Sequence, residues 1–115
     1  MKHTMKLRPS PFRMIQCGEK TYELSLYDEK RQCIKLGDDI VFVNTKTDES
    51  LVVSVKSIHI FKNFNELYQA LPLLKCGYTE ENLATANPTD MENYYSKEQQ
   101  MQYGVVAFEI EKITK

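Results

Sequence analysis

The chain has 115 residues, of which 42% are hydrophobic and 27% are charged, and its formal net charge is −1. This length predicts a single domain over residues 1–115, and the composition excludes a globally disordered chain. The net charge argues against a general nucleic-acid binder, which would be basic. The charge is distributed unevenly along the chain, since residues 1–35 carry a net charge of +4 and the remainder carries −5. The asymmetry indicates either a local basic binding face or an uneven scatter of charge over a solvated surface.

Several classes of protein are excluded by what the sequence lacks. No run approaches the roughly 18 apolar residues that a membrane-spanning helix needs, and the N-terminus lacks the apolar core of a signal peptide. The three cysteines, Cys17, Cys33 and Cys76, fit neither a disulfide framework nor paired metal ligands. The histidines His3 and His59 are isolated, so no zinc site is expected. These features predict a cytoplasmic protein with reduced thiols, no metal and no cofactor.

The opening segment, MKLRPSPF at residues 5–12, predicts a short strand that leads into a helix. Ser10 is suited to cap that helix and Pro11 to occupy its first position, where a fixed φ and a missing N–H are tolerated. Phe12 and Ile15 are expected to face inward. Gly18 is expected to end the helix, since glycine is common just past the last turn.

The next segment, TYELSLY at residues 21–27, alternates with the period of two that is typical of a strand. The alternation places three large apolar side chains on one face, those of Tyr22, Leu24 and Leu26. The other face then carries mainly polar side chains, those of Thr21, Glu23, Ser25 and Tyr27. The charged sequence DEKRQ follows as a bend.

The remaining segments predict a mixture of strands and helices. Strands are expected at 37–44, 50–61 and 105–113. Helices are expected at 63–70, 79–86 and 87–102. The last helix is expected to begin with a capping box formed by Thr89 and Glu92, and to end at Gly104. This order, with more hairpins than crossovers, predicts an α+β fold built on a curved antiparallel sheet or small barrel.

Two clusters of side chains are candidates for function, since no familiar catalytic signature is present. The first is GEKTYELSLYDEKR at residues 18–31, in which Lys20 lies beside a carboxylate, Glu23, and several hydroxyl groups. Such a set can serve in general acid–base chemistry. The alternative is a solvated strand face on which Lys20 and Glu23 form a weak surface pair.

The second cluster is NYYSKEQQMQYG at residues 93–104, which contains Tyr94, Tyr95 and Tyr103. Flat tyrosine rings stack on bases in single-stranded nucleic-acid sites. The alternative is that one or two of these rings pack on the sheet, as helical spacing also allows.

Three segments carry a resemblance to a known family: MKLRPSPFRMIQCGEKTYEL, LYDEKRQCIKLGDDIVF and YYSKEQQMQYGVVAFEI. In this order they resemble the ASCH domain (activating signal cointegrator homology) of the PUA-like superfamily. The resemblance implies a PUA-like small antiparallel β-barrel with helices packed around it. It also implies a cleft beside the barrel that binds RNA or a small nucleoside or nucleotide. Carried over by position, it implies binding roles for residues of the G-x-K-T strand and the loop after it, namely Lys20, Thr21, Glu23, Asp28, Lys30 and Arg31.

The resemblance also implies an alternative function, because small bacterial relatives are amidohydrolases that deacylate acylated cytidine. Their pattern has a lysine in G-x-K-T, matched here by Lys20, and a threonine at the position of Glu23. In that alternative Lys20 serves as the base and Glu23 as the proton carrier or orienting group. A third hypothesis, a protein-interaction domain, rests only on the acidic remainder of the chain.

Overall fold

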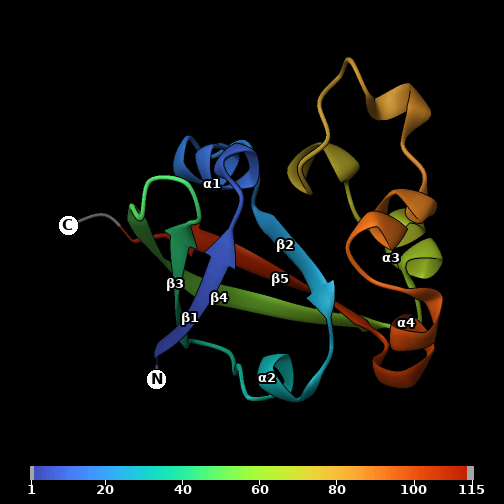
Figure 1. Cartoon of the computed structure of the whole chain (residues 1–115), viewed down its shortest axis with the longest axis horizontal. Coiled ribbons are helices and arrows are strands. Elements are labelled where there is room, and N and C mark those ends of the chain that lie inside the picture. The colour runs from blue at the N-terminus through green and yellow to red at the C-terminus, as the bar shows by residue number, and fades with distance from the viewer. Residues whose placement is uncertain (1, 114–115) are drawn as a thin grey trace.

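The computed structural model describes residues 2–113, in which strands alternate with short helices (Figure 1). Five strands are present in this part of the chain: β1 (Lys2–Leu7), β2 (Tyr22–Leu26), β3 (Asp39–Asn44), β4 (Ser50–Phe61) and β5 (Val105–Lys112). Four α-helices accompany them: α1 (Pro9–Gln16), α2 (Glu29–Gln32), α3 (Phe64–Ala70) and α4 (Lys97–Tyr103). Three 3₁₀-helices lie between α3 and α4: η1 (Leu73–Lys75), η2 (Leu83–Thr85) and η3 (Pro88–Asn93).

The five strands form one curled sheet in the order β1-β3-β4-β5-β2 (Figure 1). β1 pairs in parallel with β3, and the other three pairings are antiparallel. The parallel pair arises because the chain passes through α1, β2 and α2 between β1 and β3, a connection long enough for a crossover. Within residues 2–113 the edge strands β1 and β2 do not pair with each other, so the sheet is a half-barrel. The predicted α+β fold on a curved sheet is confirmed, with one parallel pair in place of antiparallel pairing throughout.

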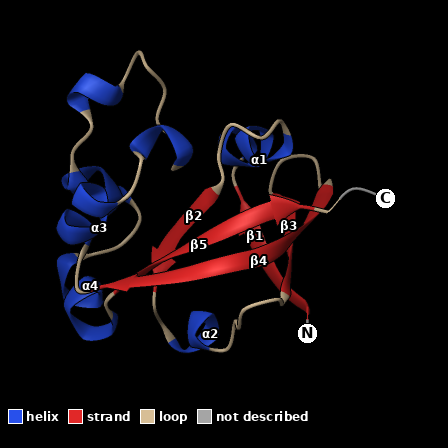
Figure 2. Cartoon of the chain, turned by 180° about the vertical axis from the view of Figure 1, so that it is seen from behind, coloured by secondary structure: helices blue, strands red, loops and turns tan. Residues whose placement is uncertain are grey.

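Helices surround the curled sheet (Figure 2). α1 lies at one end of the curl and α2 at the other, while α3, α4 and the 3₁₀-helices gather beyond the strands β2 and β5. None of the helices in residues 2–113 is long and apolar enough to cross a membrane.

Two hydrophobic clusters hold these layers together. The larger fills the inside of the curl and includes Phe12 and Ile15 of α1, both buried as predicted, together with Phe42 and Phe108 of the sheet. The smaller lies between the sheet and α3 and includes Leu24, Leu26, Phe64, Leu67 and Val105. The two clusters lie on opposite faces of the sheet, so burial of apolar surface stabilises both.

The strand β2 is buried on both faces. Leu24 and Leu26 pack in the smaller cluster, as the alternation predicted. Glu23 and Ser25, on the opposite face, are only 5% and 1% exposed. The alternative in which this face is solvated is therefore wrong, and a carboxylate lies within the folded interior.

α1 begins at Pro9, two residues before the expected first position at Pro11. Its N-cap is Arg8, whose side chain makes no capping hydrogen bond, so the predicted cap at Ser10 is wrong. Pro9 occupies the first helical position, where its ring supplies a helical φ and its missing N–H needs no cap.

The last expected helix is in fact two helices, η3 and α4. Ser96 caps α4: its hydroxyl accepts from the Gln99 N–H at 3.1 Å, and the Gln99 side chain accepts from the Ser96 N–H at 3.0 Å. This reciprocal capping box holds Ser96 in an extended conformation and separates α4 from η3. The capping box predicted for Thr89 and Glu92 is wrong, because Asn87 caps η3 instead.

α3 forms where the sequence predicted a helix, and the side chain of Asn63 caps it. The helix expected over residues 79–86 is reduced to the single turn η2. Residues 76–95 are otherwise turns, loops and η3, and this segment is called the strap below.

Candidate ligand-binding site

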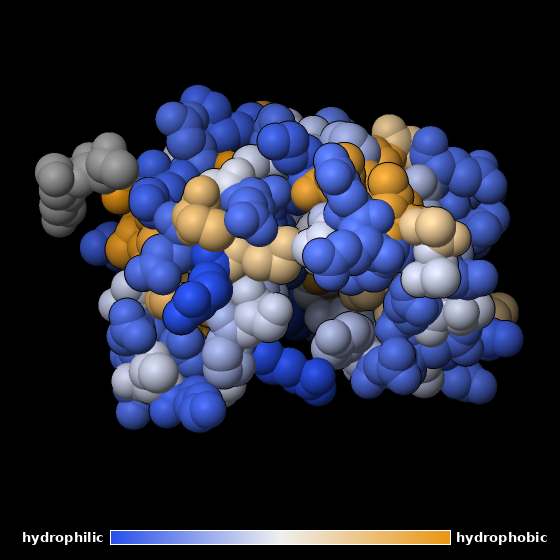
Figure 3. All heavy atoms as spheres, turned by 90° about the horizontal axis from the view of Figure 1, so that it is seen from above, coloured by the Kyte–Doolittle hydropathy of each residue, from blue (hydrophilic) through white to orange (hydrophobic). Residues whose placement is uncertain are grey.

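A cavity of about 590 Å³ opens between the strap and the end of the sheet at which β1 meets α1. Its walls come from segments far apart in the sequence: the end of β1, the helix α1, the start of β2, and the strap. Figure 3, which looks down on this end of the molecule, shows the hollow between these parts. Polar side chains distant in the sequence thus converge on one concave site, as they do in small-molecule sites.

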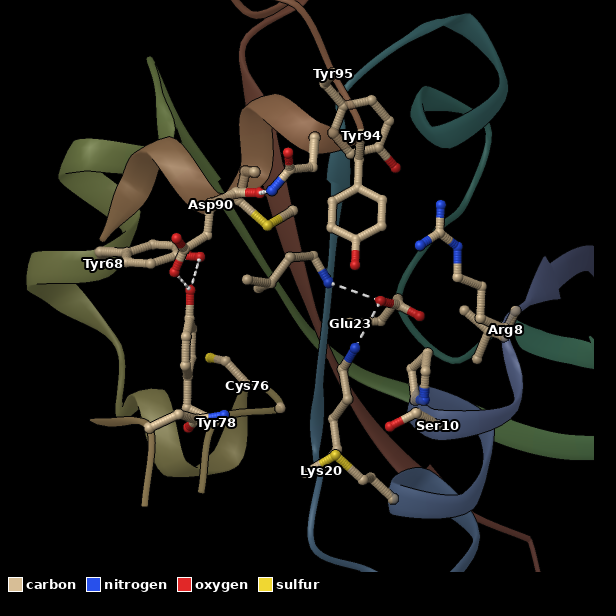
Figure 4. A pocket seen from close by; sticks show the side chains of 18 of the residues that line it. Arg8, Ser10, Lys20, Glu23, Tyr68, Cys76, Tyr78, Asp90, Tyr94 and Tyr95 are labelled. Carbon is tan, nitrogen blue, oxygen red and sulfur yellow. Dashed lines mark hydrogen bonds and ion pairs between the residues drawn. The ribbon is translucent and has the colours of Figure 1, made fainter. Parts of the chain in front are cut away.

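Lys20 and Glu23 form a buried ion pair in this cavity (Figure 4). The Lys20 Nζ lies 3.0 Å from Glu23 Oε1, and the two side chains are only 9% and 7% exposed. The same carboxylate oxygen accepts a hydrogen bond of 3.1 Å from the Leu24 N–H. The second oxygen, Oε2, is buried and has no hydrogen-bond partner within residues 2–113. A buried oxygen without a donor costs free energy, so it marks a position that a ligand donor can fill.

Backbone contacts hold the start of β2 in place. The Lys20 N–H donates to the Met14 carbonyl at 3.1 Å, and the Thr21 N–H donates to the Lys75 carbonyl at 2.9 Å. Gly77 of the strap has a φ of +110°, and a Cβ there would lie 3.6 Å from Lys20 Cδ. Glycine adopts this φ readily, so the strap can lie close along the lysine side chain. Lys20 is thereby confined between α1 and the strap.

Tyr94 and Tyr95 both line the cavity, but in different ways. Tyr95 is packed: its ring stacks on Phe64 with centroids 6.2 Å apart, and its Oη lies 3.3 Å from the Ser25 Oγ. Tyr94 is 54% exposed, and the Arg8 guanidinium carbon lies 4.9 Å from its ring centroid, a cation–π contact. Tyr94 therefore offers a ring for stacking, whereas Tyr95 is part of the packed wall.

A chain of hydrogen bonds runs along the strap side of the cavity. Tyr68 Oη and Tyr78 Oη lie 2.7 Å apart, and Tyr78 donates to Asp90 Oδ2 at 2.7 Å. Burial raises the pKa of Tyr78 above its ordinary value, and its hydrogen bonds with Tyr68 and Asp90 raise it further. Tyr78 is therefore a neutral donor at neutral pH. Burial also raises the pKa of the Cys76 thiol to about 11, so this cysteine of the wall is not a thiolate nucleophile.

The predicted site residues of the loop after β2 do not line this cavity. The Asp28 side chain caps α2 by accepting from the Arg31 N–H at 3.0 Å. The Arg31 guanidinium closes the same turn with a hydrogen bond of 2.9 Å to Asp28. Lys30, on the same helix, is exposed. α2 lies at the far end of the curl from α1 (Figure 1), and there Asp28 and Arg31 hold the first turn of α2.

Thr21 and Tyr103 also lie outside the cavity. Thr21 lines a second, smaller hollow of about 270 Å³ near the end of β5. Tyr103, the last residue of α4, lies near Glu29, whose charge raises the pKa of that phenol. Of the nine predicted site residues, the cavity brings together four, which are Lys20, Glu23, Tyr94 and Tyr95.

Other lining residues were not predicted from the sequence. Arg8 lies at the start of α1, and Tyr78 and Asp90 lie in the strap. Only the excess positive charge of residues 1–35 pointed toward Arg8, and no spacing pointed to Tyr78 or Asp90. Within residues 2–113 there is no group of three or more histidine, cysteine, aspartate and glutamate side chains that could hold a metal ion.

Comparisons with known proteins identify the family. The sequence model of the ASCH domain matches residues 5–114. Two solved structures match essentially the whole chain: the hypothetical protein PH0355, which is 34% identical with a TM-score of 0.82, and the protein PF0455 from Pyrococcus furiosus, which is 32% identical with a TM-score of 0.77. These matches cover 98% and 100% of this chain, and 100% of each of the two matched chains.

More distant structures share the fold. The ASCH from Zymomonas mobilis, at 16% identity and a TM-score of 0.68, matches 96% of this chain and 66% of its own. No curated protein sequence matches this chain. The family model, which matches residues 5–114, shows that the chain belongs to the ASCH domain family.

Proposed function

We propose that this protein binds RNA, or a small nucleotide or nucleoside, in the cavity between α1 and the strap. The observation that carries the proposal is the buried Lys20–Glu23 pair, whose Oε2 lacks a donor within residues 2–113. The edges of nucleobases carry N–H donors beside carbonyl or ring-nitrogen acceptors. A carboxylate oxygen next to an ammonium offers a complementary acceptor and donor, so a base edge satisfies both.

The size and lining of the cavity support a ligand of nucleotide size. Its volume of about 590 Å³ lies within the range of roughly 300–1,000 Å³ that is usual for small-molecule sites. Tyr94 supplies an exposed ring on which a base can stack, as in single-stranded nucleic-acid sites. Leu7, Met14 and Met91 add apolar surface for the rest of the ligand.

The charges around the cavity favour an uncharged base inside and an anion at the rim. Lys20 is paired with Glu23, so the buried pair is neutral overall. Lys6 and Arg8 line the cavity but are exposed, which suits contacts with a phosphate. Three of the eight lysines and arginines of residues 1–35, namely Lys6, Arg8 and Lys20, line this cavity, so a local cationic site is compatible with a net charge of −1.

The test is equilibrium binding of the full chain to a labelled, randomised single-stranded RNA and to the four 5′-mononucleotides. Lys20→Ala is expected to weaken binding by about tenfold, as for the loss of a charge-assisted contact. Lys30→Ala removes the same charge from α2, outside the cavity, and is expected to leave the affinity unchanged. Circular dichroism of each variant separates a lost contact from a lost fold.

Two results contradict the proposal. One is the absence of binding to every probe at low salt. The other is an equal loss of affinity in Lys20→Ala and Lys30→Ala, which assigns any binding to general electrostatic attraction rather than to the cavity.

Amide hydrolysis of an acylated cytidine is the second candidate function. The observation that favours it is that Lys20 and Glu23, to which the resemblance assigns catalytic roles, share one cavity. Release of acetate from N4-acetylcytidine tests it directly. Turnover that Lys20→Ala abolishes supports this candidate, whereas no turnover, or a rate that the substitution leaves unchanged, contradicts it.

A cytoplasmic location is part of the same proposal. It is supported by the free thiols of Cys17, Cys33 and Cys76, which suit a reducing compartment.

A further inference from the structure

Asp90 presents a fixed carboxylate at the cavity, on the side away from Arg8 (Figure 4). Its Oδ2 accepts two hydrogen bonds, from Tyr78 Oη at 2.7 Å and from the Asn87 N–H at 3.1 Å. Tyr78 is itself held by Tyr68, whose Oη lies 2.7 Å away. The other oxygen, Oδ1, receives no hydrogen bond from the residues that the structure describes. The strap thus fixes the carboxylate by one oxygen and leaves the other for a ligand.

The hydrogen-bonding capacity and charge of the Asp90 carboxylate determine which part of a ligand can lie beside it. A carboxylate accepts hydrogen bonds and donates none, so hydroxyl and amino groups are its partners. Its negative charge repels a phosphate, which the cations at the rim attract instead. A nucleotide in this cavity therefore has its phosphate toward Arg8 and a neutral, hydroxyl-bearing part toward Asp90.

We infer that Asp90 binds the ribose hydroxyls of the ligand, so that the site prefers ribonucleotides to deoxyribonucleotides. This inference rests on the proposed function and adds the sugar to it. The cavity carries three chemically different groups: the cation Arg8, the neutral Lys20–Glu23 pair and the anion Asp90 (Figure 4). A ribonucleotide has three matching parts, which are its phosphate, its base edge and its 2′,3′-diol.

General recognition chemistry supports the assignment of the diol to Asp90. Acidic side chains bind ribose hydroxyls in dinucleotide sites, where one carboxylate accepts from the sugar. The 2′-hydroxyl is also the group by which a protein distinguishes RNA from DNA. Tyr78 acts as a positioning residue, since its neutral phenol holds Oδ2 without adding a charge.

The experiment compares the dissociation constants of each 5′-ribonucleotide and its 2′-deoxy counterpart on the full chain. For the unaltered protein the ribonucleotide is expected to bind about tenfold more tightly, the effect of one hydrogen bond to a charged group. Asp90→Asn is expected to bring that ratio close to one. Equal affinity for the two sugars in the unaltered protein overturns this inference and leaves the proposed function standing. No affinity for either sugar overturns both.

Two control variants separate contact with the sugar from the shape of the strap. Glu92→Gln removes the same charge two residues along the chain. Glu92 does not line the cavity and lies 3.9 Å from Lys97, so the preference for ribose is expected to persist. Tyr78→Phe removes the donor that positions Oδ2 but keeps the Asp90 carboxylate, so the preference for ribose is expected to fall by less than in Asp90→Asn. A preference lost as fully in Tyr78→Phe as in Asp90→Asn assigns the effect to the shape of the strap and overturns the inference.

Discussion

The Lys20 ammonium and the Glu23 carboxylate lie together in the folded interior, with 3.0 Å between Nζ and Oε1. Burying such a pair is costly, and breaking it is costlier still because one charge is left without its partner. The carboxylate nevertheless keeps one buried oxygen without a hydrogen-bond donor inside residues 2–113. The fold alone therefore does not satisfy this pair, and the proposed binding site rests on that observation.

Lys20→Met is expected to destabilise the fold, since it leaves Glu23 buried without its counter-charge. Loss of one partner of a buried ion pair typically costs about 3 kcal/mol. The double variant Lys20→Met/Glu23→Gln removes both charges and is expected to regain most of that loss. Urea unfolding at neutral pH measures the three free energies of unfolding. A double variant as unstable as the single one would show that the two charges are not coupled.

Tyr94→Leu is expected to weaken nucleotide binding without unfolding the protein. The ring is 54% exposed, so its loss leaves the core intact, whereas stacking of one base is worth about 1–3 kcal/mol. An affinity lower by about tenfold is expected, measured by calorimetry with a 5′-mononucleotide. Tyr94→Phe keeps the ring and is the matched control. If the phenylalanine variant binds as weakly as the leucine variant, stacking is not the role of this ring.

Asp38 is expected to make the stability sensitive to acid. A hydrogen bond with His3, at 2.8 Å, and another from the Lys35 N–H lower the pKa of Asp38 from 3.8 to about 2. A carboxyl whose pKa is lower in the folded state stabilises the fold above its unfolded pKa, and that contribution disappears as the pH falls through the folded value. The thermal midpoint is therefore expected to drop between about pH 4 and pH 2.

Asp38→Asn tests that origin of the acid sensitivity. The amide does not titrate, so the drop between about pH 4 and pH 2 is expected to be shallower than in the unaltered protein. Thermal unfolding followed by circular dichroism at several pH values provides the comparison. Parallel profiles for the two proteins over this range would assign the acid sensitivity to other carboxyl groups.

Ser96→Ala is expected to lower the stability by about 1 kcal/mol, the usual effect of losing a helix N-cap. Its hydroxyl accepts from the Gln99 N–H at the start of α4. Thr89→Ala, at the position where the sequence predicted a cap, removes only an exposed hydrogen bond to Asn87 and is expected to change the stability by less than about 0.5 kcal/mol. Chemical denaturation compares the two. A larger loss of stability in Thr89→Ala than in Ser96→Ala would indicate that Thr89 caps the helix, as the sequence predicted.

Local patterns were sufficient to predict most of the sheet. Strands such as β3 and the first half of β4 bury alternate side chains, so the sequence of these strands has a period of two. The expectation of one helix over residues 87–102 was wrong, because this segment contains two possible capping sequences. Thr89 and Glu92 match the pattern of a capping box, but the box at the start of α4 forms between Ser96 and Gln99.

The site was predictable only where its residues are close in the sequence. Lys20 and Glu23 belong to one short segment, and Tyr94 and Tyr95 are adjacent. Asp90 was missed because the convergence of β1, α1 and the strap depends on the tertiary fold, which no local period encodes.

The charged run at residues 28–31 lies apart from the cavity. The resemblance implied a ligand contact there, and in the structure Asp28 caps α2 and forms an ion pair with Arg31. Helix capping and ligand binding use the same residue types, so composition alone does not separate them.

Chemical-shift mapping by two-dimensional NMR tests most directly the central claim, that a nucleotide binds between α1 and the strap. The probe is the tightest-binding of the four 5′-mononucleotides, added to the nitrogen-15-labelled full chain. The predicted result is a set of saturable shifts centred on the amides of Lys20, Glu23, Gly77 and Tyr94, with none at Lys30. Shifts centred on α2, or the absence of saturable shifts around the cavity, would contradict the claim.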